Sequence, residues 1–111
     1  MSQIAAVLFL LAALGGIVML VRLLRRRELP WPLAIAHGVL AAIALILVLI
    51  AFLQGKANLA TPLVLFVIAA LGGFVLLSFH LRKRVHPLWL AVIHGLVAVT
   101  GFIFLLLAIL S

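Results

Sequence analysis

Two histidines, His37 and His94, are the side chains in this sequence best suited to chemistry. Each lies inside a long apolar stretch, is followed by a glycine, and comes seven residues after a proline, Pro30 or Pro87. A neutral imidazole is a common ligand for transition metals. Because an ionisable side chain is costly to place inside an apolar span, the pair is a candidate functional site.

Four long stretches without charged side chains must position these histidines: residues 1–21, 29–55, 57–81 and 85–111. Each reaches the roughly 20 residues that cross the hydrocarbon core of a bilayer. The chain has 111 residues, of which 70% are hydrophobic and only one is acidic. Such a composition cannot supply the polar surface of a soluble domain. The sequence therefore predicts a single, all-α transmembrane domain over residues 1–111.

The sequence matches itself without a gap when it is shifted by 57 residues. Residues 4–54 and 61–111 share 23 identities in 51 aligned positions. Apolar composition alone does not explain the matched residues of other types, which are Gly15-Gly16 with Gly72-Gly73, Arg25 with Arg82, Pro30 with Pro87, and His37-Gly38 with His94-Gly95. We interpret the repeat as duplication of a two-helix unit. Because each unit crosses twice, the two hairpins are parallel and related by a pseudo-twofold axis along the membrane normal.

The short connections between the spans predict an up-down four-helix bundle. The expected helices cover residues 4–24, 32–53, 62–81 and 87–110. A proline begins each of the last three, at Pro32, Pro62 and Pro87. Proline fits the first turn of a helix, where its missing N–H group costs nothing.

Seven of the eight basic residues lie in two short clusters beside the apolar spans: Arg22, Arg25, Arg26 and Arg27, then Arg82, Lys83 and Arg84. Positive charge in short loops marks the cytoplasmic side of a membrane. We therefore expect an integral protein of the bacterial inner membrane, with loops 22–28 and 82–86 in the cytoplasm and both termini outside. The clusters account for most of the net charge of +7 without a nucleic-acid partner, and they can hold anionic lipid headgroups.

The glycine pairs are expected at the same depth as the histidines. Gly16 lies nine residues before Arg25 and Gly73 nine before Arg82, about 13 Å along a helix axis, and the histidines lie about 10 Å from their prolines. In an up-down bundle the second and fourth helices are diagonal. Two inward histidines between glycine-lined walls would form a slot for a flat macrocycle, whose iron takes two axial imidazoles.

This pattern resembles the four-helix core of the transmembrane b-type cytochromes, in which histidines on two helices ligate haem b and glycines on the other two let the ring pack closely. The resemblance implies that His37 and His94 are the metal ligands of one haem b. It also implies that Gly15, Gly16, Gly72 and Gly73 line the ring, with Arg22, Arg25 and Arg82 beside its propionates. The implied function is electron transfer with quinol or a redox partner protein. Large members of the family carry two histidines on each ligand helix, whereas one is present here, so at most one such haem is implied.

A second interpretation stays open, because a histidine at a helix contact can simply bond a backbone carbonyl of the next helix. Small residues four apart, such as Ala12 and Gly16, occur at many tight transmembrane interfaces. The chain would then be a non-catalytic accessory or assembly subunit, in a homo- or hetero-oligomer, with structural or pigment-ligating histidines. A drug–proton exchanger is disfavoured because no carboxylate lies in a span. A hydrolase is disfavoured because no nucleophile–base pair is evident.

Overall fold

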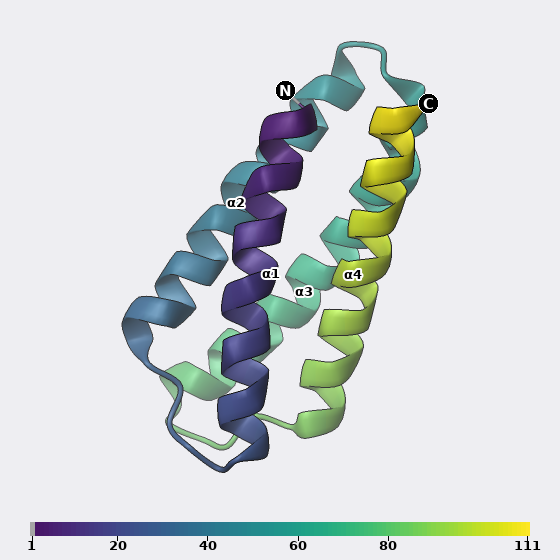
Figure 1. Cartoon of the computed structure of the whole chain (residues 1–111). Helices are drawn as coiled ribbons and strands as arrows, with labels where there is room; N and C mark the ends of the chain where they lie inside the picture. Colours follow the sequence, from purple (N-terminus) through teal and green to yellow (C-terminus); the bar gives the residue numbers. More distant parts are fainter. Residues whose placement is uncertain (1) are drawn as a thin grey trace.

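Residues 2–111 are described by a computed structural model that contains four long α-helices in an up-down bundle (Figure 1). The helices are α1 (Ser2–Leu24), α2 (Trp31–Leu53), α3 (Ala60–Leu81) and α4 (Leu88–Leu110), and a short 3-10 helix, η1 (Ala57–Leu59), precedes α3. Each of the four is long and apolar enough to cross a membrane. The expected all-helical bundle of four apolar helices is therefore confirmed. The duplication and the membrane topology stay predictions.

The four helices end at the residues expected from the sequence and begin within two residues of the expected starts. Pro32 and Pro62 lie in first turns, as expected. The placement of Pro87 inside the fourth helix was wrong. It precedes α4 with an extended backbone, φ −64° and ψ 121°, and its carbonyl accepts the N–H of Ala91. Pro87 therefore caps the helix instead of belonging to it.

The α1–α2 and α3–α4 turns share one backbone design. In the first, the N–H of Arg27 bonds the carbonyl of Arg22, and the N–H of Arg26 bonds that of Leu23. This is a Schellman motif, which requires a left-handed residue just after the helix. Arg26 and Lys83 occupy that position, both with φ 54°. Glycine normally fills it, so each turn carries some backbone strain.

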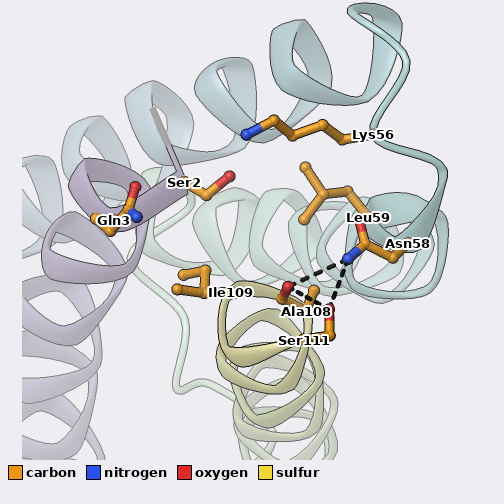
Figure 2. Close-up of a pocket in the computed structure, with 8 residues that line it drawn as sticks. All are labelled: Ser2, Gln3, Lys56, Asn58, Leu59, Ala108, Ile109 and Ser111. Carbon is orange, nitrogen blue, oxygen red and sulfur yellow. Dashed lines mark hydrogen bonds between the residues drawn. The ribbon is translucent and has the colours of Figure 1, made fainter.

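The two ends of the bundle differ in character. One, the basic end, holds both Schellman turns, and the other, the terminal end, holds residue 2, residue 111 and the α2–α3 connection (Figure 1). At the terminal end, the side-chain amide of Asn58 donates to the carbonyl of Ala108 at 3.1 Å and to the hydroxyl of Ser111 at 3.0 Å (Figure 2). These bonds join η1 to the end of α4 beside a cavity of about 270 Å³, which Lys56 also lines.

The buried core occupies only the terminal half of the bundle. At its centre the rings of Phe9 and Phe66 stack with centroids 3.7 Å apart. None of the described residues in 13–43 or 70–100 is fully buried, and these two ranges form the basic half. The buried residues are Ser2, Ala5, Phe9, Ala12, Ala44, Val48, Ala51, Leu59, Pro62, Phe66, Ala69, Gly101 and Leu105.

The helices also pair unequally. Each packs most extensively against its partner in the same hairpin, α1 with α2 and α3 with α4. Between the hairpins, α1 contacts α4 more extensively than α2 contacts α3. The α2–α3 side is therefore the less closely packed seam of the bundle.

The Schellman turns give a first testable prediction. Lys83→Gly should stabilise the protein by about 1 kcal/mol, because glycine adopts the left-handed conformation without steric cost. Thermal unfolding in detergent measures the change. Arg84→Gly is the matched control, since it removes the same charge from a neighbouring residue without positive φ. Equal effects of the two substitutions would contradict the strain at Lys83.

Candidate functional site

His37 reaches from α2 to the backbone of α1. Its Nδ1 atom lies 2.6 Å from the carbonyl oxygen of Ala12. A carbonyl can only accept a hydrogen bond, so Nδ1 of the neutral ring carries the proton and donates it. The contact therefore sets the tautomer of His37 and leaves the lone pair on Nε2.

His94 makes the corresponding contact in the second hairpin. Its Nδ1 atom lies 2.7 Å from the carbonyl oxygen of Ala69 on α3. Both histidines are half-buried, and both acceptor residues are among the last buried positions before the basic half. The two imidazoles thus lie where the packed core ends, each bonded to the other helix of its own hairpin.

The glycine pairs of α1 and α3 lie directly against these rings. A Cβ atom at Gly16 would come within 3.1 Å of Cε1 of His37, and one at Gly73 within 3.2 Å of Cε1 of His94. At Gly15 and Gly72 the same rings or their Cβ atoms would lie 3.6–3.7 Å away. The glycines therefore let each imidazole approach the neighbouring backbone. Their contact with a haem ring stays a prediction.

The structure also brings the two histidines together. Their ring centroids are 6.2 Å apart, and the ring planes are inclined by 76°. The two rings come from different hairpins, so their separation depends on how the hairpins pack and not on the sequence of either one. A pair of half-buried imidazoles at this separation can hold a single metal atom between them.

The three arginines expected beside the haem propionates lie at the basic end. Nε of Arg22 donates to the backbone carbonyl of Glu28 at 2.7 Å. Arg82 donates to the backbone carbonyl and the hydroxyl of Ser78, both at 3.2 Å. Arg25 lies in the turn after α1. These bonds support the helix ends, and the propionate role stays a prediction.

A second aromatic cluster at the basic end was not anticipated as a unit. The ring of Trp31 on α2 lies 3.8 Å from that of His80 on α3, and His80 lies 5.5 Å from His86 in the α3–α4 turn. Burial, and secondarily the charge of His80, lowers the pKa of His86. One feature of the sequence could have indicated this cluster. At all three positions the two repeats differ, and the other repeat has leucine there, at Leu88, Leu23 and Leu29.

No protein-family model, curated protein or solved structure matches this chain. The site is therefore interpreted from its own geometry. Two groups of histidines are present. His37 and His94 form a pair at the edge of the core, and His80 packs against Trp31 at the basic end.

The contact between Gly73 and His94 can be tested by substitution. Gly73→Leu should destabilise the protein by about 1–3 kcal/mol, because the added side chain must displace the imidazole and break its bond to Ala69. Thermal unfolding in detergent is the measurement. Gly95→Leu is the control, since a Cβ at Gly95 meets nothing within 4 Å. Unchanged stability of the Gly73→Leu variant would contradict the packing described.

The second cluster predicts a sensitivity to acid. Because the pKa of His86 in the folded protein lies below its ordinary value of 6.5, the unfolded chain takes up the proton first as pH falls. Protonation of His86 should therefore lower the free energy of unfolding below about pH 6.5, and it should have no effect on stability above that pH. NMR titration of the ring should give a midpoint below 6.5.

Two variants separate the causes of this shift. His80→Leu should raise the pKa of His86 only part of the way, because burial remains. His86→Leu should make stability less dependent on pH in the acid range. A midpoint at or above 6.5 in the unaltered protein would contradict the burial of this side chain.

Proposed function

We propose that the protein is a membrane-embedded b-type cytochrome in which His37 and His94 hold one haem for electron transfer. The observation that carries the proposal is the close pair of imidazoles, whose ring centroids lie 6.2 Å apart. A metal–imidazole bond of about 2.0–2.1 Å, plus about 1 Å from nitrogen to ring centre, puts two opposed ligands about 6 Å apart. The observed spacing therefore suits the two axial ligands of one iron.

The hydrogen bonds of the histidines support the same role. Metal-ligating histidines usually donate their other ring N–H to a carbonyl or carboxylate, which fixes the ring and makes it a better ligand. His37 and His94 each donate Nδ1–H to a main-chain carbonyl, of Ala12 and Ala69. Nε2 of each ring is then the atom that would bind iron.

The looser packing of the basic half supports the binding of a large apolar ring there. Fully buried side chains occur in the terminal half of the bundle. None of the described residues in 13–43 or 70–100, which form the basic half, is fully buried. A macrocycle bound between the imidazoles would supply apolar contacts to helices that lack a core of their own in this half. Its propionates would face the basic end, where Arg22, Arg25 and Arg82 can neutralise them.

The cofactor would supply one-electron chemistry, and the protein would orient it. If both imidazoles bound the iron, electron transfer would be favoured over oxygen chemistry. Four helices long and apolar enough to cross a membrane support a site within the membrane, and the basic turns favour the cytoplasmic side for the basic end. Quinol or a neighbouring redox protein is then the partner.

A second function is favoured by one specific observation. Both imidazole N–H groups are already satisfied by carbonyls within their own hairpins, so the histidines can serve as structural locks without a cofactor. An accessory or assembly subunit of a membrane complex would need nothing more. The partner helices would then cover the loosely packed basic half.

The visible spectrum distinguishes the two functions. The dithionite-reduced protein should show the bands of a low-spin haem, and His37→Ala or His94→Ala should remove them, because each variant lacks one axial ligand. His80→Ala and His86→Ala are the controls and should keep the bands, since those rings lie at the basic end. Low-spin haem that persists in the His37→Ala protein would overturn the assignment, and a colourless protein from haem-replete cells would favour the accessory subunit.

A further inference from the structure

The cavity at the terminal end is lined by polar side chains, which are rare in this apolar chain (Figure 2). Its volume is about 270 Å³, well above the roughly 10–15 Å³ that a single water needs. The start of α1, the α2–α3 connection and the end of α4 build it together, so a ligand of several atoms has room to contact all three segments. The polar residues that line it are Ser2, Gln3, Lys56, Asn58 and Ser111.

The lining of this cavity carries a positive charge and no acidic side chain. Lys56 is exposed, and Figure 2 shows its side chain extended over the cavity toward Ser2. The only acidic residue of the chain, Glu28, lies in the α1–α2 turn at the basic end, so it cannot pair with this ammonium. The first turn of α1 adds N–H groups that have no acceptor within the helix, at the positive end of its dipole. The cavity therefore favours an anion.

Ser2 is the most buried polar side chain of the cavity. The residue is only 6% exposed, and its hydroxyl takes part in none of the hydrogen bonds of the described side chains at this end. Figure 2 shows the hydroxyl directed into the cavity, which Ser2 lines. Leaving a buried hydroxyl without a partner is costly, and an acceptor bound in the cavity would satisfy it.

Asn58 holds two walls of the cavity together before any ligand binds. Its amide donates to the carbonyl of Ala108 and to the hydroxyl of Ser111, and that hydroxyl donates to the same carbonyl at 2.7 Å. The α2–α3 connection is thus fixed to the end of α4, with Lys56 only two residues before the fixed point. A preformed site loses less conformational freedom when it binds a ligand.

We propose that the terminal cavity binds a phosphate group, with the ammonium of Lys56 and the hydroxyl of Ser2 as its side-chain donors. Phosphate oxygens accept strong, charge-assisted hydrogen bonds from ammonium groups, and the start of a helix favours an anion. In a bundle that crosses a bilayer, this end would lie at the level of the headgroups, so the phosphate belongs either to a phospholipid or to inorganic phosphate in solution. The bound group would join α1 to the α2–α3 connection. The inference goes beyond the proposed cytochrome function and requires no haem.

The side-chain amides of the chain provide a local test. They belong to Gln3, Gln54 and Asn58, of which Gln3 and Asn58 line the cavity and Gln54 does not. Two-dimensional proton–nitrogen NMR spectra of the full chain, in a phosphate-free maltoside detergent, can follow all of them while dihexanoylphosphatidylglycerol is added. The signals of Gln3 and Asn58 should shift saturably, and the signal of Gln54 should stay in place.

Parallel titrations with inorganic phosphate and with dihexanoylglycerol separate the sources. Saturable shifts with the phospholipid alone would support a headgroup site, and saturable shifts with inorganic phosphate would support a site for free phosphate. Dihexanoylglycerol has the same acyl chains without the phosphate, so equal shifts with this lipid would overturn the proposal. The absence of shifts with both phosphate compounds would also overturn it.

A matched pair of lysine variants tests the donor. Lys56→Gln should raise the half-saturating concentration of the phosphate compound that binds by about tenfold, because a charge-assisted hydrogen bond is lost. Lys83→Gln removes the other lysine of the chain, at the opposite end of the bundle, and should leave this concentration unchanged. Ser2→Ala should raise it by a smaller factor, since a neutral donor is lost. Equal effects of the two lysine variants, or unchanged binding by Lys56→Gln, would overturn the assignment.

Discussion

A histidine inside an apolar helix must satisfy its N–H group, and this requirement organises both hairpins. In each, the imidazole donates to a main-chain carbonyl of the neighbouring helix, at Ala12 or Ala69. An imidazole can come this close only where the neighbouring helix has no side chain in its way, and Gly16 and Gly73 provide that space. The glycine, the carbonyl and the histidine therefore form one unit, which fixes the depth at which the two helices of a hairpin meet.

The bundle has two halves with different packing. The terminal half is held by a core centred on the stacked rings of Phe9 and Phe66 and by the bonds of Asn58 to the end of α4. The basic half lacks fully buried side chains among its described residues, and a short turn joins the two helices of each hairpin there. In the two functions proposed above, a haem or a partner helix would complete the packing around the imidazole pair. Tight packing at one end can keep the four helices in register while the other end accommodates a ligand.

The two hairpins share the histidine unit but differ at the basic end. Trp31, His80 and His86 form an aromatic cluster where the repeat-related positions are all leucine. The cluster connects α2 to α3 and to the following turn, beside the more open of the two seams between hairpins. The part common to both hairpins therefore builds the symmetric imidazole pair. The residues that differ between the hairpins give the α2–α3 seam an aromatic surface that the α1–α4 seam lacks.

The sequence by itself determined the number of helices, their last residues and the residues worth testing. Those features depend on local properties, namely the length of apolar runs, the placement of arginines and the constant offset of the repeat. The position of Pro87 was missed by one residue, because a proline before a helix and one in its first turn look alike in sequence. The tertiary structure alone decided the acceptors of the histidines, the 6.2 Å between their rings and the unequal seams. In an apolar chain the faces toward lipid and toward other helices have the same composition, so periodicity cannot tell them apart. Packing within each hairpin sets the contact between histidine and carbonyl, and packing between the hairpins sets the distance between the two rings.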